Sequence, residues 1–249
     1  MAGEFWLDDY QWAAIELLLP TNQPGARRTD DRRVISAIIH VLKFGCRWQD
    51  CPACYGPSTT IYNRFHRWSA RGIWRQLFDA LVKTNDTDIQ MIDSTTAKAH
   101  RSAAGGKGGR RPRPHRSRGG RSTKIHAVVD RCGRPVAIKI TPGQRGDAPV
   151  AMSLLEPLPP SRLCAADTAY DSNALRLFLI RRGTRPVIPN NPTRKRMQPF
   201  DPEAYKRRNI IERMFCRLKD WRRVATRYDK LAINFIATCY IAAIVNWWI

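Results

Sequence analysis

The sequence predicts an α/β domain with a mixed sheet, preceded by a small helical domain, and three observations support this. Residues 5–85 carry apolar positions at helical spacing, separated by Pro and Gly. From residue 88 onward, short apolar segments alternate with longer helical patterns, the order typical of an α/β sheet. A Gly/Arg/Pro-rich segment without acids, 101–123, interrupts this second region. We therefore expect domains at 1–85 and 86–249, with a flexible basic insert at 101–123.

The N-terminal region contains start and stop signals for short helices. One helix is expected after Asp8 and ends before Pro20. The next begins near Asp30 and ends before Gly45. A further break at Gly72 separates the last two helices of this region.

The third helix of this region, expected from the capping signal at residues 57–60, is basic and aromatic. It carries Arg64 and Arg67 between aromatic residues. Short helices of this kind are typical of a helix-turn-helix domain that reads DNA, in which Arg64 and Arg67 would contact the nucleic acid. A plain helical bundle with a solvated basic face is the alternative interpretation.

The second region alternates strands and helices. Two segments, 124–130 and 135–141, flank the turn sequence DRCGR and predict a β-hairpin. Two helices are expected after Asp147 and Asp171, which we interpret as N-caps. The remaining strand candidates are 88–93, 162–167 and 184–189.

The charge of the chain predicts a polyanionic partner. The chain has 43 Lys and Arg against 21 Asp and Glu, a formal net charge of +22. Such an excess favours double-stranded DNA or another nucleic acid, because neutralised phosphates release counterions. An acidic membrane is the rival partner, but no lipidation motif or amphipathic anchor supports it.

Three features of the sequence predict the cellular compartment of the protein. The apolar run at 234–249 is shorter than the ~20 residues that a membrane span requires, so we expect a core helix there. Seven cysteines, an odd number, and an N-terminus that does not resemble a signal peptide favour reduced thiols. We therefore expect a cytoplasmic protein.

Three acids are candidates for chemistry. Asp93 and Asp167 each close an apolar strand, and side chains at the carboxyl edge of a sheet often form the site in α/β proteins. Glu212 lies among cations on a helix expected at 205–219. If the three converge, they would hold two Mg²⁺ or Mn²⁺ ions. Strand-terminal Asp residues are also common turn formers, so the residues alone leave both interpretations open.

The helix expected at 205–219 has the spacing Y-x2-R-x3-E-x6-K. These positions fall within an arc of about 60° on an α-helix, so Tyr205, Arg208, Glu212 and Lys219 would share one stripe. Apolar residues mark another side, which gives the helix a core to pack on. Arg208 and Lys219 beside the acid would bind phosphate.

Several stretches of the chain resemble one known family. They are MIDSTTAKAH, RSRGGRSTKIHAVVD with TPGQRGD, AADTAYDS, YKRRNIIERMFCRLKDWRRVATRYDKLAINF and, nearer the N-terminus, LLLP, GCRW and GPSTTIYNRFHRW. In order and spacing they resemble the DDE transposases of bacterial insertion sequences, specifically the insertion sequence 5 group. One departure is visible, because the second acidic motif usually reads D-K-G-Y-D and here has Thr168 and Ala169 in the middle.

The resemblance implies a ribonuclease H-like catalytic fold, with Asp93, Asp167 and Glu212 as ligands of two Mg²⁺ or Mn²⁺ ions. The enzyme would bind the terminal inverted repeats of an insertion sequence and hydrolyse a phosphodiester at each end. It would then use the freed 3′-hydroxyl to attack target DNA. Because two ends are handled together, we expect a homodimer in the DNA complex, at the bacterial nucleoid.

The resemblance also implies roles for neighbouring residues. Tyr205, Arg208 and Lys219 would position DNA near the cut, and Lys124 and His126 on the hairpin are further candidates. Two other functions remain open from the residues: a catalytically decayed copy that only binds DNA and represses, and a nucleic-acid chaperone that acts through the basic segment.

Overall fold

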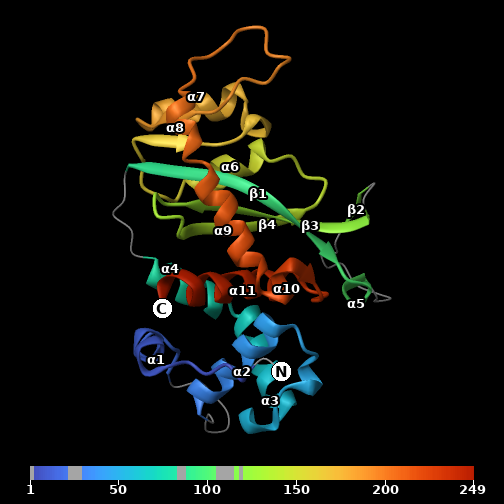
Figure 1. Ribbon diagram of the computed structural model, residues 1–249. Coiled ribbons are helices and arrows are strands. Elements are labelled where there is room, and N and C mark those ends of the chain that lie inside the picture. The colour runs from blue at the N-terminus through green and yellow to red at the C-terminus, as the bar shows by residue number, and fades with distance from the viewer. Residues whose placement is uncertain (1–2, 22–29, 83–87, 105–114, 118–119) are drawn as a thin grey trace. The chain divides into compact units, whose positions relative to one another are not determined.

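The computed structural model describes residues 3–21, 30–82, 88–104, 115–117 and 120–249 (Figure 1). The chain forms two compact units. Unit 1 comprises Met1–Lys83, Ala99–Arg113 and Leu218–Ile249, and unit 2 comprises Thr84–Lys98 and Pro114–Arg217. The domain boundary expected near residue 85 stays a prediction, because a grouping by packing does not test which part folds independently.

Unit 1 is built mainly from helices. Its longer helices are α1 (Asp9–Glu16), α2 (Asp31–Phe44), α3 (Ser58–Ala70), α4 (Ile73–Leu81) and α11 (Ala232–Ala243). Shorter pieces are the 3₁₀ helices η1 (Trp48–Asp50) and η2 (Ala53–Tyr55) and the π-helix η4 (Ile244–Trp248). The others are α5 (Arg101–Ala104), α10 (Arg222–Ala225) and β7 (Thr226–Arg227).

The predicted helix ends are confirmed in part. Asp8 and Asp30 cap α1 and α2 through their side chains, and Gly45 ends α2 in the left-handed conformation with φ 79°. The capping signal expected at 57–60 is wrong, because the N-cap of α3 is Pro57, which offers no side-chain acceptor. Thus α3 begins with its first N–H groups uncapped.

The C-terminal apolar run forms the core helix that we expected. Helix α11 packs against α2, α3 and α4 within unit 1, and Phe235, Ile241 and Ala242 are buried there. No helix within the described ranges is both long and apolar enough to cross a membrane.

Unit 2 has a mixed sheet. Its strands are β1 (Ile89–Ala99), β2 (His115–Ser117), β3 (Gly120–Val129), β4 (Pro135–Pro142), β5 (Leu163–Ala165) and β6 (Arg185–Val187). They lie in the order β2-β3-β1-β5-β6, with β4 paired to β3. Strand β1 runs antiparallel to β3 and parallel to β5, and β5 runs parallel to β6. The expected mixed sheet and the β3–β4 hairpin are confirmed.

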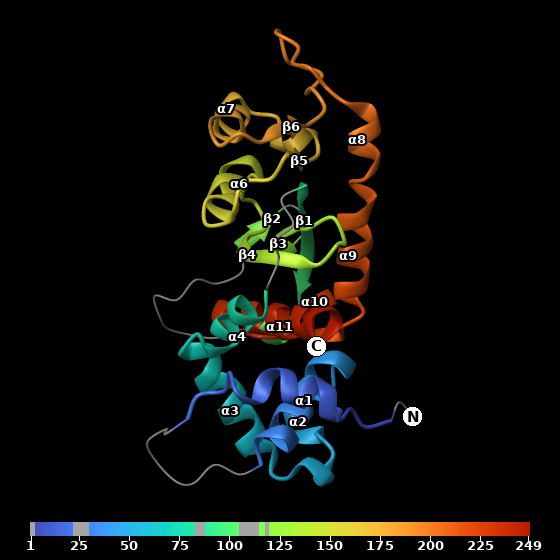
Figure 2. The ribbon, with the colours of Figure 1, turned by 90° about the vertical axis from the view of Figure 1, so that its left-hand side faces the viewer.

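Helices cover both faces of this sheet. Figure 2 shows α6 (Ala148–Leu155) and α7 (Asn173–Arg181) on one side. On the other side lie α8 (Pro202–Lys206) and α9 (Asn209–Lys219). The ends of the basic insert expected at 101–123 form α5, β2 and the start of β3, while residues 105–114 and 118–119 lie outside the described residues.

Candidate active site

Strand β1 positions Asp93, but the strand does not end there as the sequence predicted. It continues to Ala99, because the residues after Asp93 keep pairing with β3, Asp93 opposite Ala127 and Lys98 opposite Ser122. The side chain of Asp93 is 12% exposed, and the N–H of Ser94 donates to its Oδ1 at 2.7 Å. Asp93 therefore sits in the middle of a sheet rather than at its edge.

Asp167 reaches the same level of the sheet from β5. The parallel pairing of β1 with β5 ends at Met91 opposite Ala165, so Asp93 and Asp167 each follow two residues later. Asp167 caps a short turn, η3 (Thr168–Tyr170), by accepting the N–H of Ala169 at 2.9 Å. Two strands of different length thus bring these two carboxylates to one level.

Arg208 lies between the three acids. Its Nη2 donates to Asp93 Oδ2 at 2.8 Å and is 4.0 Å from Asp167 Oδ2, and its Nη1 contacts Glu212 Oε1. Arg208 is 13% exposed, and its Nε has no hydrogen-bond partner within the described part of the chain. We call Asp93, Asp167 and Glu212, with Arg208, the carboxylate cluster.

The helix expected at 205–219 is two helices with a tight turn between them. Arg207 and Arg208 separate α8 from α9, and the turn bonds run three residues back, from Arg208 N to Tyr205 O and from Ile211 N to Arg208 O. Tighter turns of this type commonly connect helices. The turn places Arg208 over the acids, and Glu212 follows in the first turn of α9.

The electrostatics of the cluster are unbalanced. Burial raises the pKa of Asp93 to about 6, although Arg208 and the Ser94 N–H lower it and the two neighbouring acids add to the rise. Burial alone would lower the pKa of Arg208, but Asp93 and Glu212 outweigh it and raise that pKa. One guanidinium thus neutralises only part of the charge of three carboxylates.

The donor set of the cluster fits a divalent cation. Three carboxylates are hard oxygen donors of the kind that Mg²⁺ and Mn²⁺ prefer. They already share one cation, the guanidinium of Arg208. In the described residues no three acids, histidines or cysteines are arranged to hold a metal ion as they stand. Binding of an ion therefore requires Arg208 and the acids to rearrange.

Two further predicted residues lie on α8 and α9. The ring of Tyr205 lies under Arg208, with the guanidinium carbon 5.9 Å from the ring centroid, and it packs edge-on against Phe200. Lys219 is the last residue of α9 and belongs to unit 1. Their contacts with DNA stay predictions.

The two candidates on the hairpin face another acid. Lys124 Nζ donates to both carboxylate oxygens of Asp147, at 2.9 and 3.0 Å. His126 is fully buried, its Nε2 is 2.7 Å from Thr141 Oγ1, and its Nδ1 is 3.6 Å from Asp147 Oδ1. Burial lowers the pKa of His126 to about 4, against the effect of Asp147. In this conformation Lys124 is hydrogen-bonded to Asp147, and the His126 ring lies beside the same carboxylate. The contacts of both residues with DNA stay predictions.

Asp147 occupies the N-cap position of α6 that we expected, but its side chain does not cap the helix. It precedes α6, but its side chain makes no capping hydrogen bond, and it instead accepts the hydroxyl of Ser94 at 2.9 Å as well as Lys124. Sequence reasoning missed this role, because an Asp before a helical pattern has the local signature of a cap. We call Ser94, Lys124, His126 and Asp147 the Asp147 cluster.

Asp171 is also not a cap, since Ser172 caps α7. Burial would raise the pKa of Asp171, but hydrogen bonds from Arg194, the Asn191 N–H and Arg176 outweigh it and lower the pKa to about 2. Asp171 therefore ties the loop after β6 to α7.

Tyr170 is a further residue that sequence reasoning missed. Its hydroxyl is buried beside the Ser94 side chain, at a geometry that falls outside a regular hydrogen bond. Burial raises its pKa, with Asp147, Asp93 and Asp167 adding to the rise. Its place in the motif AADTAYDS was the available signal, and the Thr168 and Ala169 that depart from the usual motif are exposed in the turn before it.

The two candidates on α3 differ in exposure. Arg64 is buried, contacts Asp31 and lies over the ring of Trp68. Arg67 is exposed, and its Nε donates to Asn63 O at 3.3 Å. Arg64 thus holds unit 1 together in this conformation, whereas Arg67 is open to a ligand. As DNA contacts, both stay predictions.

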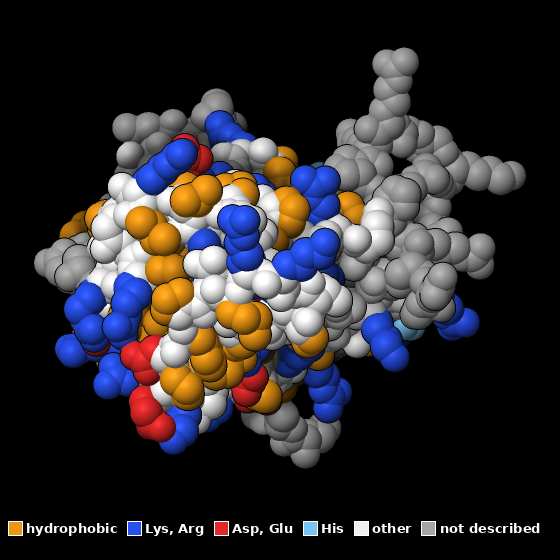
Figure 3. All heavy atoms as spheres, turned by 90° about the horizontal axis from the view of Figure 1, so that it is seen from above, with side chains coloured by type: hydrophobic (Ala, Val, Ile, Leu, Met, Phe, Trp, Pro, Cys, Tyr) orange, Lys and Arg blue, Asp and Glu red, His pale blue; other side chains and the backbone are white. Residues whose placement is uncertain are grey.

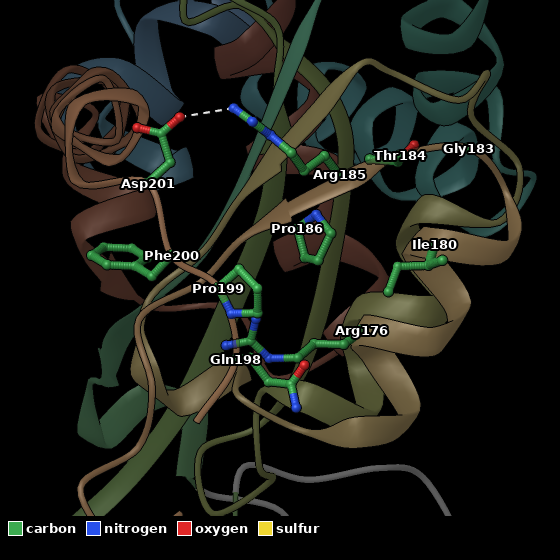
Figure 4. Close-up of a pocket in the computed structure, with 10 residues that line it drawn as sticks. All are labelled: Arg176, Ile180, Gly183, Thr184, Arg185, Pro186, Gln198, Pro199, Phe200 and Asp201. Carbon is green, nitrogen blue, oxygen red and sulfur yellow. Dashed lines mark hydrogen bonds and ion pairs between the residues drawn. The ribbon is translucent and has the colours of Figure 1, made fainter. Parts of the chain in front are cut away.

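A separate pocket of about 560 Å³ lies in unit 2 near the ends of α7 and β6 (Figure 4). Pro186, Pro199 and Phe200 line it, and an ion pair between Arg185 and Asp201 crosses its rim at 2.8 Å. None of the predicted site residues lines it. The view from above shows Lys and Arg around an apolar strip, with few acids (Figure 3).

Two acids that follow strands of a mixed sheet and a third on α9 thus lie together in a chain of net charge +22. Residues 84–247 match the family described as "Transposase DDE domain", and residues 7–78 match "Putative transposase of IS4/5 family". The chain therefore belongs to the DDE transposase family, whose members generally use divalent metals.

Two relatives carry the same description. A putative transposase for insertion sequence element IS6501 of Brucella ovis is 41% identical over 127 residues, which are 51% of this chain and 98% of that protein. A putative transposase for insertion sequence element IS402 of Burkholderia cepacia is 30% identical over 121 residues, 44% of this chain and 55% of that protein. The expected family is confirmed.

Solved structures support the fold. The piggyBac transposase, in its synaptic complex with hairpin DNA, aligns over 98% of this chain and 70% of its own, with a TM-score of 0.54 and 12% identity. The expected ribonuclease H-like mixed-sheet class is confirmed.

Proposed function

We propose that this transposase binds the terminal inverted repeats of an insertion sequence, cuts a DNA strand at each end and joins it to target DNA. The observation that supports this most is the carboxylate cluster, in which three acids share a single cation. A site with unneutralised carboxylates in a chain of net charge +22 fits a reaction that needs both cations and a polyanion.

Asp93, Asp167 and Glu212 would hold two Mg²⁺ or Mn²⁺ ions, which when bound would polarise the scissile phosphate and activate the attacking oxygen. Strands and main-chain hydrogen bonds hold Asp93 and Asp167 near one another, so movement of Arg208 and rotation of the carboxylates would complete the site. Arg208 would stabilise the free site by holding the acids together. On binding, it would turn to a phosphate oxygen.

The reaction has two displacements. In the first, a water oxygen bonds to phosphorus, the bond to the 3′-oxygen breaks, and that oxygen takes up a proton to become a 3′-hydroxyl. In the second, this 3′-hydroxyl loses its proton to the solvent and bonds to a phosphorus of target DNA, whose own 3′-oxygen leaves. Tyr205, Lys219, Lys124, His126, Arg64 and Arg67 are the proposed contacts to DNA.

We further propose that the enzyme acts as a homodimer on DNA, in the bacterial cytoplasm at the nucleoid. Handling two element ends together requires two active sites. The bacterial relatives described above support the setting.

Incubation of the protein with Mg²⁺ and DNA that carries the element's ends tests the proposal. We expect Glu212→Gln to lower nicking and strand transfer more than about 1000-fold, because one carboxylate ligand is lost. Glu212 is 54% exposed, so the variant should fold. Glu203→Gln on α8, an exposed acid paired with Lys206, is the matched control and should cut normally.

Two outcomes contradict the proposal in different ways. If the wild-type protein binds the ends and neither nicks nor joins them, the function is that of a DNA-binding repressor. If Glu212→Gln cuts as fast as Glu203→Gln, the assignment of the site is wrong.

A further inference from the structure

A second site lies within unit 1, in a groove of about 950 Å³ between α3, η1 and the segment after β7. The residues that line it include Trp48, Tyr62, His66, His100, Arg223 and Tyr228. It is separate from the carboxylate cluster, which belongs to unit 2. Its size is sufficient for a small organic ligand.

Aromatic rings form much of the groove wall. Tyr62 and His66 lie one helical turn apart on α3, with their rings 7° from parallel and their centroids 6.0 Å apart. Trp48 meets Tyr62 edge-on at 5.4 Å. Two further rings of the lining, those of Tyr228 and His100, pack together with their centroids 4.8 Å apart. Tyr62 is 37% exposed, so a ring face remains open to a flat ligand.

Arg223 connects the two groups of rings. Its guanidinium carbon lies 5.3 Å from the ring centroid of Trp48 and 5.4 Å from that of Tyr228. Its Nη2 donates to Cys46 O at 2.8 Å, and its buried Nε has no hydrogen-bond partner within the described ranges. An arginine held between two aromatic rings is a rigid cation beside a stacking surface.

The charges at the groove favour an anionic ligand. Arg47, Arg223 and Lys230 contribute cations, and Asp229 is the one acid among the lining residues that the structure describes. Asp229 is buried and lies close to Arg223 and Arg227, which oppose its charge. The ligand should therefore carry negative charge as well as a flat aromatic face.

The first turn of α3 adds to this preference. Ser58 and Thr59 line the groove at the start of this 13-residue helix, and its N-cap, Pro57, provides no side-chain acceptor. Uncapped N–H groups at a helix N-terminus attract phosphate. His100 and Ser102 on the opposite wall lie where the acid-free basic segment of the chain begins.

We propose that this groove binds an unpaired nucleotide of the DNA, with its base stacked on the aromatic wall and its phosphate near the cations. In a duplex the faces of the bases are covered by their neighbours, so only a nucleotide outside the stack can use exposed rings. The proposal rests on the proposed function, which brings the chain to DNA. It adds that the helix expected to read duplex DNA, α3, also carries a single-strand subsite.

The test compares two DNA probes that differ only in an unpaired tail. The full-length protein is titrated with a blunt duplex and with the same duplex bearing a short oligo-dT tail, and binding is followed by fluorescence anisotropy. We expect the Tyr62→Ala substitution to weaken binding of the tailed DNA by about 10-fold and to leave the blunt duplex unchanged. Tyr62→Trp, which keeps a ring face, should retain tail binding. Tyr10→Ala on α1 removes an equally large but more exposed tyrosine, 79% exposed, outside the groove and is the control.

Two results overturn the proposal. An equal loss on both probes shows that Tyr62 contacts duplex DNA or supports the fold, and no loss on either shows that the groove does not bind the tail. Both leave the proposed function intact, because wild-type binding and cutting of element ends are measured separately. Failure of the wild-type protein to bind either probe removes both the function and the subsite.

Discussion

Two polar clusters lie on opposite faces of β1, and they differ in how their charge is balanced. Toward α9, the carboxylate cluster sets three acids against one guanidinium, and two of the three remain partly open to solvent. Toward α6, the Asp147 cluster pairs one acid with Lys124, and both side chains are mostly buried. Successive side chains of a strand point to opposite faces, so Asp93 and Ser94 place the clusters back to back.

This difference in charge balance indicates that the carboxylate cluster is arranged to bind a cation, whereas the Asp147 cluster supports the fold. On the α9 face, burial raises the pKa of Asp93 to about 6 despite the neighbouring Arg208, which means that the charge of Asp93 is poorly compensated. A bound divalent cation would compensate it. On the α6 face both carboxylate oxygens of Asp147 have hydrogen-bond partners, and Lys124 balances its charge. Among the described residues of this cluster, the buried His126 Nδ1, 3.6 Å from Asp147 Oδ1, lacks a hydrogen bond. The charge of this cluster is therefore balanced without a bound cation. The cluster holds β1, β3 and α6 together behind the site.

Removal of the Asp147 carboxylate should give the largest change in stability. Asp147→Ala leaves Lys124 without its counter-charge and the Ser94 hydroxyl without its acceptor. We expect the free energy of unfolding to fall by about 3 to 5 kcal/mol, as measured by urea denaturation. The matched control is Asp79→Ala, whose carboxylate is in an exposed pair with Arg75 and should matter little.

A second variant tests the reason for this loss. The double replacement Lys124→Met and Asp147→Leu removes both charges and should recover much of the stability, because neither charge is left buried alone. If Asp147→Ala lowers the free energy of unfolding no more than Asp79→Ala does, the Asp147 cluster does not support the fold, and the proposed difference between the two faces of β1 is wrong.

The acids of the carboxylate cluster were within reach of sequence reasoning, and the role of Arg208 was not. Asp167 follows from the end of its strand, Glu212 from its spacing on the helix, and all three acids from the family resemblance. The strand end expected at Asp93 is wrong, because β1 runs on to Ala99. Whether Arg208 faces DNA or the acids depends on the tight turn between α8 and α9 and on how α9 lies over the sheet. The spacing of residues along the sequence predicts neither the turn nor the placement of α9.

For the Asp147 cluster, a local sequence signal predicted the wrong role for the side chain. An Asp in front of a helical pattern predicts a cap, yet its partner Lys124 lies 23 residues earlier on another element. Only the pairing of β3 with β1, which sets Ser94 opposite His126, brings the cluster together. The hairpin itself was predictable, because its turn and its strands are local. Which of its side chains would be buried was not, because that depends on the helix that covers them.

The pH dependence of stability offers a finer test of the α6 face. His126 has a folded pKa of about 4, below the ordinary value of 6.5, so between these values the unfolded chain binds more protons than the folded one. This histidine therefore adds up to about 3 kcal/mol to the free energy of unfolding as pH rises from 4 to 6.5, and nothing further above that. Denaturation across this range should show the rise in the wild-type protein.

The matched variant is His126→Gln, which cannot titrate. Its free energy of unfolding should lack this part of the rise, and above pH 7 its curve should run parallel to that of the wild-type protein. Parallel curves for the wild-type protein and His126→Gln between pH 4 and 6.5 would show that His126 is accessible to protons in the folded state.

The smallest expected effect is the one that addresses the α9 face most directly. Mg²⁺ at about ten times its dissociation constant should raise the free energy of unfolding of the DNA-free protein by about 1.4 kcal/mol, since it binds only the folded carboxylates. Thermal unfolding with Mg²⁺ and with a chelator measures this increment without any activity assay. Asp93→Asn should abolish the increment, and Glu203→Gln should keep it. Asp147→Ala, although less stable, should also keep it, because its cluster lies on the other face of β1. If Asp147→Ala loses the increment too, the two clusters are coupled through Ser94, because its N–H donates to Asp93 and its hydroxyl donates to Asp147. In that case the Asp147 cluster also affects the affinity of the carboxylate cluster for the cation.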